Sequence, residues 1–277
     1  MSDTLLRVRG LTVAFPDANG PGEVVKALDF DLARGGALGI VGESGSGKSM
    51  TSLAIMGLLP KGAERTGSIE FDGAELTALP ERAMRSYRGD RIAMIFQDPL
   101  SSLNPYYTVG TQIAEAYRSH RAGVTRRQAR AVAIEAMERV HIADAATRVD
   151  HYPHQFSGGM RQRVMIAMTL SMEPELIIAD EPTTALDVTV QAQILDLLAE
   201  IRADTGAGLI LITHDLAVVS EVADHIVVMR DGDLVEQGTA ERIFTDPQAP
   251  YTRMLLDAVP RIDDEIGLLR TLTEEAR

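Results

Sequence analysis

The sequence contains no cysteine and no tryptophan, and lysine is confined to Lys26, Lys48 and Lys61. Without cysteine the chain can form no disulfide framework, no thiolate zinc site and no iron–sulphur cluster held by cysteines. This absence fits a reducing cytosol. The hydrophobic content of 45% is ordinary for a globular protein and can supply a full core.

Positive charge is also scarce. The formal net charge is −13, from 40 acidic and 27 basic residues. A general nucleic-acid binder gains affinity when its basic residues release phosphate counterions, so this balance argues against one. We expect no nucleic-acid partner, although net charge says little about a partner that docks through a local patch.

Long apolar runs are missing as well. No stretch approaches the roughly 18 uninterrupted apolar residues that cross a bilayer. The first ten residues lack the apolar segment of a signal peptide. We therefore expect any membrane role to come through another chain.

The N-terminal third alternates between polar and apolar residues. Leu5–Phe15 and Glu23–Leu32 are predicted to be antiparallel strands, and Gly67–Leu76 a further short antiparallel element. Between them, Ala37–Val41 is a short apolar strand that leads through a glycine-rich loop into a helix over Ser49–Leu59.

The pattern between Asp98 and Phe156 is helical. Thr125 and Gln128 form a capping-box signature, followed by apolar residues at helical spacing. Strands then alternate with helices again, which implies a parallel sheet with crossover helices. Asp231-Gly232, between two short strands, predicts a hairpin.

A glycine-rich loop stands between the predicted strand Ala37–Val41 and the following helix. Its sequence fits the P-loop pattern, in which backbone N–H groups surround phosphate oxygens and glycines allow a close approach. Lys48 should reach the β- and γ-phosphates, and the Ser49 hydroxyl should bind Mg²⁺. The residues predicted to bind ATP are Gly42, Glu43, Ser44, Gly45, Ser46, Gly47, Lys48, Ser49 and Met50. Kinases, GTPases and recombinases share this loop, so alone it indicates only a nucleotide.

A second apolar strand, starting at Leu176, ends in Asp180 and Glu181. Asp180 is predicted to hold the hydration shell of Mg²⁺, and Glu181 to orient or deprotonate the attacking water. Acids at strand ends are also common as simple turn formers. The P-loop in the same chain favours the catalytic interpretation.

Between these two motifs lies Phe156-Ser157-Gly158-Gly159-Met160-Arg161-Gln162-Arg163. The sequence resembles the ABC ATPase family, whose signature is usually Leu-Ser-Gly-Gly-Gln. Phe156 replaces its Leu and Met160 its Gln, whereas Ser157, Gly158 and Gly159 are kept. The resemblance implies that Ser157 to Met160 close on the ATP held by an opposite subunit.

Further elements of that family follow in order. Gln97 matches the glutamine that senses Mg²⁺ and couples to the membrane subunit. Asp187 matches the loop that crosses the dimer interface, and His214 the histidine that contacts γ-phosphate. Phe15 stands where the family stacks an aromatic ring on adenine, although a core residue at a strand end is an alternative interpretation.

The resemblance implies an α/β P-loop NTPase with a RecA-like parallel sheet core, an N-terminal antiparallel β subdomain and an inserted helical subdomain. We expect an ABC ATPase domain over residues 1–260, with the helical insert at about 98–156, and a short tail over 261–277.

Several segments resemble the class of this family that imports oligopeptides, dipeptides or nickel. These are Ser101–Pro105, Val109–Gln112, Asp180–Gln193 and Pro250–Pro260. The chain stops short of the tail that many members carry, and it lacks the cysteines that bind a cluster in some. These departures leave the cargo open: peptides are expected, with nickel or another small solute as the alternative.

The resemblance also implies partners. Two integral-membrane permeases and a second ABC ATPase are expected, in a heterodimer or a homodimer, with an extracytoplasmic solute-binding protein acting indirectly. Such a subunit would bind ATP and Mg²⁺ at the cytoplasmic face of the membrane. A soluble ABC ATPase of DNA repair or ribosomes is the rival, but such proteins usually carry a coiled-coil insert, zinc-binding cysteines or two ATPase domains.

Overall fold

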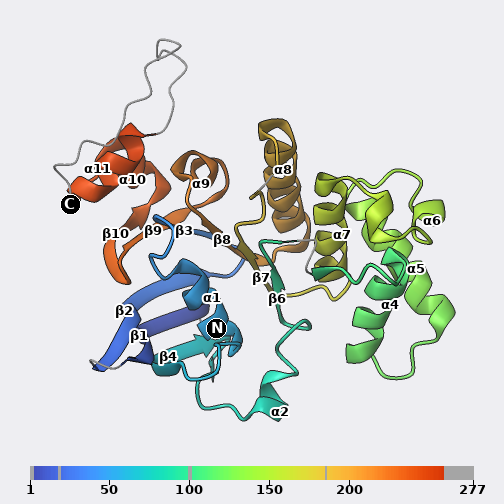
Figure 1. The fold of residues 1–277 in the computed structure, drawn as a ribbon, viewed down its shortest axis with the longest axis horizontal. Helices are drawn as coiled ribbons and strands as arrows, with labels where there is room; N and C mark the ends of the chain where they lie inside the picture. The colour runs from blue at the N-terminus through green and yellow to red at the C-terminus, as the bar shows by residue number, and fades with distance from the viewer. Residues whose placement is uncertain (1–2, 18–19, 99–101, 185, 259–277) are drawn as a thin grey trace. The chain divides into compact units, whose positions relative to one another are not determined.

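A computed structural model describes residues 3–17, 20–98, 102–184 and 186–258 (Figure 1). The chain divides into two compact units. The first unit combines Met1–Thr77 with Ile210–Arg277, and the second is Ala78–Leu209. Segments from both ends of the sequence therefore fold together in the first unit.

An antiparallel sheet in the first unit contains the predicted N-terminal strands. Its order is β2-β1-β4-β5. The strands are β1 (Thr4–Asp17), β2 (Gly20–Ala33), β4 (Glu64–Phe71) and β5 (Ala74–Glu75). Val8 on β1 lies opposite Phe30 on β2 and Ile69 on β4, and all three side chains are buried. Because side chains alternate between the two faces of a strand, the apolar residues lie on one face of the sheet and form a core.

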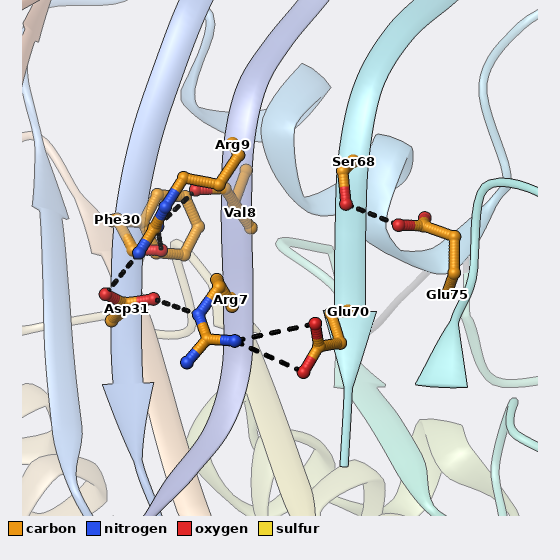
Figure 2. A network of polar contacts seen from close by, with 8 residues as sticks. All are labelled: Arg7, Val8, Arg9, Phe30, Asp31, Ser68, Glu70 and Glu75. Atoms are coloured by element: carbon orange, nitrogen blue, oxygen red, sulfur yellow. Dashed lines mark hydrogen bonds and ion pairs between the residues drawn. The ribbon is translucent and has the colours of Figure 1, made fainter. Parts of the chain in front are cut away.

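Charged side chains connect the same strands (Figure 2). Asp31 on β2 pairs with Arg7 at 3.5 Å and with Arg9 at 2.6 Å. Arg7 also reaches Glu70 on β4 at 3.3 Å. These partly exposed pairs each contribute at most about 1 kcal/mol, so they support the strand register more than the stability.

A second set of strands in the first unit has the order β10-β9-β3-β8. Their bounds are β3 (Ala37–Val41), β8 (Gly208–Thr213), β9 (His225–Arg230) and β10 (Asp233–Thr239). β3 runs parallel to β9, and β10 returns antiparallel to β9, which confirms the predicted hairpin. Every residue of β3 and β8 is buried, as in a sheet covered on both faces.

The helices of the first unit are α1 (Lys48–Met56), α9 (Leu216–Val222), α10 (Ala240–Thr245) and α11 (Pro250–Asp257). α1 is shorter than the predicted Ser49–Leu59. It ends because Gly57 adopts a left-handed conformation (φ 61°) and its N–H caps the last turn. α9 packs directly on β3, since a Cβ at Gly39 would lie 2.1 Å from Val219 Cγ1.

The second unit pairs two parallel strands, β6 (Ile92–Ile95) and β7 (Leu176–Asp180). Its helical elements are α2 (Glu81–Met84), α4 (Val109–His120), α5 (Arg126–Arg139), α6 (Ala145–Arg148), the 3₁₀ turn η1 (Pro153–Gln155), α7 (Gly158–Leu170) and α8 (Val188–Thr205). Figure 1 shows α4, α5, α6 and α7 gathered into one group.

The predicted capping box begins α5. The Thr125 hydroxyl accepts from the Gln128 N–H at 3.3 Å, and the Gln128 side chain accepts from the Thr125 N–H at 3.0 Å. Behind this cap, Ala129, Ala133 and Met137 are fully buried at helical spacing. The local signature and the apolar periodicity both specify this helix.

These features confirm the expected fold class. An antiparallel N-terminal sheet, parallel strand pairs and a helical group all occur in the described residues. None of the helices in those ranges is both long and apolar enough to span a bilayer.

Candidate functional site

The glycine-rich loop connects β3 to α1, as predicted. Gly42, Gly45 and Gly47 all have positive φ angles, of 155°, 83° and 97°. Two of these glycines also have no room for a side chain. A Cβ on Gly42 would lie 2.1 Å from Met229 O, and a Cβ on Gly47 would lie 2.3 Å from Val24 O. Any larger residue at either position would therefore displace the backbone of the loop.

Lys48 lies beneath this loop and is only 4% exposed. Its Nζ donates to the carbonyl oxygens of Gly42 and Glu43, both at 2.7 Å. The Ser46 hydroxyl is 3.5 Å away. A buried ammonium group is thus held inside the curve of the loop, where it can exchange a carbonyl partner for a phosphate oxygen.

The start of α1 completes an anion-binding geometry. Its N-cap is Gly47, which has no side chain to cap the helix, and the first turn carries no acid. The N-terminal end of a helix has a partial positive charge and unpaired N–H groups. Together with Lys48, this end of the helix can bind a polyphosphate.

The exposed parts of the loop are Glu43, Ser44 and Gly45, whereas Ser49 and Met50 are half-buried. Among the other predicted residues of the first unit, Phe15 is half-buried on β1 opposite Gly22. His214 is exposed directly after β8.

The acid pair belongs to the second unit. Asp180 is 7% exposed at the end of β7. Glu181 follows it with a left-handed backbone (φ 46°), which is uncommon for a residue with a side chain and turns the chain sharply after the strand. Gln97 Nε2 donates to Glu181 Oε2 at 2.9 Å. The structure therefore brings together two predicted residues that lie 84 positions apart.

Thr184 makes a contact with Glu181 that the sequence analysis did not predict. Its hydroxyl donates to the same Glu181 oxygen at 2.9 Å. Gln97 and Thr184 together fix one carboxylate oxygen of Glu181. Thr184 lies only three residues after Glu181, so the contact could have been proposed from the sequence. A threonine in a turn, however, has many possible hydrogen-bond partners.

The predicted signature residues start α7. Ser157 is the N-cap, and its hydroxyl accepts from the Met160 N–H at 3.4 Å. A Cβ on Gly159 would lie 2.5 Å from Val190 Cγ1, so α7 and α8 approach closely there. Gly158 is the first residue of α7. This arrangement gives the helix start a hydroxyl and exposed backbone, the groups that bind anions.

Asp187 caps the neighbouring helix α8. Its Oδ1 accepts from the Val190 N–H at 3.0 Å. This local role explains an aspartate at that position without any partner subunit. Ala185, two residues before Asp187, lies outside the described residues.

A second missed residue comes from the C-terminal end of the described chain. The Tyr251 hydroxyl, on α11, accepts from the Glu43 N–H of the glycine-rich loop at 3.2 Å. No local pattern around Tyr251 indicates this contact, because its partner is 208 residues away in the sequence.

Two family models match the chain. The family model described as "ABC transporter" matches residues 25–184. The model described as "Oligopeptide/dipeptide transporter, C-terminal region" matches residues 235–277. The second match covers α11 and therefore includes Tyr251.

Curated relatives match nearly the whole chain. The dipeptide transport ATP-binding protein DppD of Haemophilus influenzae is 50% identical over 97% of this chain and 81% of its own length. The oligopeptide transport ATP-binding protein OppD of the same organism is 50% identical over 94% of this chain and 80% of its own.

Solved structures show the same fold. A dimeric post-hydrolysis state of the ATP-binding cassette MJ0796, bound to ADP and Pi, matches with a TM-score of 0.75 and 25% identity, over 85% of this chain and 98% of that one. CbiO1 of Clostridium perfringens, from the complex cbiONQ, matches with a TM-score of 0.75 and 27% identity, over 88% and 92%. The chain therefore belongs to the ABC transporter family and is an ATPase of that family.

Proposed function

We propose that this chain hydrolyses ATP to power the import of peptides through membrane subunits. The observation that carries the proposal is the glycine-rich loop, in which buried Lys48 and the start of α1, whose N-cap is Gly47, form a polyphosphate cradle. The match of residues 235–277 to the oligopeptide/dipeptide transporter C-terminal region favours peptide cargo. The names of the dipeptide and oligopeptide transport relatives support the same cargo.

In this proposal the site residues divide the binding and the chemistry between them. Lys48 and the loop N–H groups neutralise the β- and γ-phosphates, and Phe15 stacks on adenine. Glu181 orients or deprotonates the attacking water, while His214 contacts the γ-phosphate. The hydrogen bonds from Gln97 and Thr184 favour a single orientation of the Glu181 carboxylate, as a water-positioning group needs.

Three oxygen-bearing side chains fit Mg²⁺ in this proposal. Ser49, Gln97 and Asp180 offer a hydroxyl, an amide oxygen and a carboxylate, and Mg²⁺ prefers oxygen ligands and keeps several waters. Asp180 would act through such a water. A bound Mg²⁺ would neutralise charge on the transferring phosphoryl group.

Exposed aromatic side chains of the second unit support a membrane partner. Phe96, next to Gln97, is 42% exposed, and Tyr106 and Tyr107, just before α4, are 84% and 52% exposed. Large apolar side chains that are exposed are candidates for contacts with a partner. We assign these three side chains to contacts with the cytoplasmic segments of the permease subunits, which would place the chain at the cytoplasmic face of the membrane.

A second ATPase subunit completes the proposal. Ser157, Gly158, Gly159 and Met160 would close on the ATP held by the other subunit, with Asp187 at the interface between them. The partner would be a second copy or a related ATPase, and an extracytoplasmic binding protein would deliver the cargo. The dimeric cassette bound to ADP and Pi supports a paired arrangement.

The substitution Glu181→Gln tests the catalytic assignment. It keeps the hydrogen-bonding shape of the side chain but removes the base, so ATP affinity should persist while hydrolysis falls on the order of 100-fold or more. Glu175→Gln, which changes an acid paired with Arg91 in the same unit, is the control. Normal hydrolysis by Glu181→Gln would remove Glu181 from the mechanism.

Transport assays test the cargo. Cells that carry the complete transporter should accumulate a radiolabelled dipeptide, and Lys48→Ala should abolish that uptake. Accumulation of Ni²⁺ without the dipeptide would favour the nickel alternative. A chain that does not co-purify with any membrane protein would instead favour a soluble ABC ATPase.

A further inference from the structure

The helix α11 is connected to β10 by hydrogen bonds to the carboxylate of Glu236. Glu236 on β10 accepts hydrogen bonds from the N–H groups of Gln248 at 2.8 Å and Ala249 at 3.0 Å. α11 has Ala249 as its N-cap and therefore no cap from its own side chain. The Glu236 carboxylate takes over that role and complements the positive end of the helix.

Burial alone would raise the pKa of Glu236, but the Thr252 side chain, the two backbone N–H groups and the positive charge of Arg242 together outweigh burial, and the pKa is lowered. The carboxylate therefore stays ionised at neutral pH. α11 is consequently held at its first turn, which also carries Tyr251.

Tyr251 extends from α11 to the glycine-rich loop. It is 6% exposed, and its ring lies under the Arg230 guanidinium, whose carbon is 4.9 Å from the ring centre. This cation–π contact fixes the plane of the ring. The hydroxyl then accepts from the Glu43 N–H at 3.2 Å.

The other side of the loop is held by the β9–β10 turn. The Gly232 N–H donates to Ser46 O at 3.2 Å. A hydrogen bond from Ser46 N to Glu43 O at 3.2 Å closes the turn between the two anchored residues. The loop is thus anchored at Glu43 and Ser46 by the segment that runs from β9 to α11.

We infer that Tyr251 is a positioning residue for nucleotide binding. Through Tyr251, the C-terminal region sets the shape of the glycine-rich loop before ATP binds. This inference rests on the proposed ATP site and adds a residue to it. A loop already in its binding shape loses less conformational freedom when the ligand binds. Tyr251 touches neither phosphate nor water in this scheme; it acts through Glu43.

The test uses the full-length chain and the variant Tyr251→Phe, which keeps the ring and its contact with Arg230. Affinity for ATP should fall about three- to tenfold, as expected for the loss of one hydrogen bond. KM for ATP should rise while kcat is retained, because the loop is held alike in the ground and transition states. Tyr117→Phe is the control, since Tyr117 also lies near an arginine, Arg121 at 6.0 Å, but on α4.

A second variant and a second readout separate positioning from general stability. Glu236→Gln weakens the attachment of α11 and should lower ATP affinity in the same direction. In both variants the Glu43 N–H should exchange with deuterium faster, while the Gly57 N–H, which caps α1, should not. This comparison remains decisive if Tyr251→Phe also lowers the melting temperature.

Unchanged ATP affinity in Tyr251→Phe, or an unchanged ratio of the Glu43 and Gly57 exchange rates, would overturn the inference. Failure of the wild-type chain to bind ATP in the same assay would instead overturn the proposed function. The two failures are therefore distinguishable.

Discussion

At the scale of single residues, Lys48 shows how a binding group is kept ready. Its ammonium group is buried, and the carbonyl oxygens of Gly42 and Glu43 compensate for the lost water. A phosphate oxygen offers a charged acceptor in place of a neutral one, so binding strengthens the hydrogen bond. In the proposed site, the charge of Lys48 is therefore already in position before the phosphate binds.

The substitution Lys48→Ala should therefore weaken ATP binding by about 10- to 100-fold, the range expected when a hydrogen bond to a charged group is lost. Equilibrium titration with a fluorescent ATP analogue measures this effect. Lys61→Ala removes an exposed lysine after α1 and should leave the affinity unchanged. Equal affinities in the two variants would contradict the assigned role of Lys48.

At the scale of secondary-structure elements, Glu75 closes the β4–β5 turn (Figure 2). Its carboxylate accepts from the Ser68 hydroxyl and from the N–H groups of Ile69 and Thr77, both at 3.0 Å. Burial alone would raise its pKa, but the hydrogen bonds from Ser68, Thr77 and the backbone lower it to about 2 from a usual 4.5. The turn is therefore stabilised by the ionised form of one acid.

A pKa that is lower in the folded state stabilises the fold above the unfolded value, and this stabilisation is lost on acidification. The contribution of Glu75 should be complete above about pH 4.5 and should disappear as the pH falls toward about 2. The Glu75→Gln variant should thus have a lower free energy of unfolding than the wild type at pH 6. Urea unfolding should show that this difference becomes smaller below pH 4. Glu70→Gln, in a partly exposed ion pair with Arg7, is the control. A gap that does not change with pH would contradict this assignment.

At the scale of the whole molecule, the predicted site residues are distributed over both compact units. The glycine-rich loop and His214 belong to the first unit, whereas Gln97, Glu181 and α7, which Ser157 caps, belong to the second. In the proposed dimer, Ser157 serves the ATP of the partner. A substitution there should separate nucleotide binding from hydrolysis.

Ser157→Arg should keep the ATP affinity of its own glycine-rich loop, because in the proposed dimer Ser157 contacts the nucleotide of the partner. It should lower hydrolysis at least tenfold, since a bulky cation replaces the helix cap that would meet the partner's nucleotide. Binding titrations and ATPase rates on the same preparation measure the two effects. Ser220→Arg, at an exposed position of α9, is the control. Loss of ATP binding in Ser157→Arg would argue against a shared site.

Much of the fold followed from local patterns. The capping box at Thr125, the Asp231-Gly232 hairpin and the strand Ala37–Val41 all depend on residues close together in sequence, and all are confirmed. The predicted end of α1 was three residues too late, at Leu59 rather than Met56. Gly57 ends the helix earlier because it can adopt a left-handed conformation without strain.

The sequence by itself determined the chemistry of this protein: a loop of glycines around Lys48, a strand that ends in Asp180 and Glu181, and a serine that starts a helix at Ser157. Each is a short motif whose spacing fixes its geometry. Only the tertiary structure decided that Tyr251 contacts Glu43 and that Gln97 meets Glu181, over separations of 208 and 84 residues. Such contacts depend on how distant segments pack, and no local spacing encodes them.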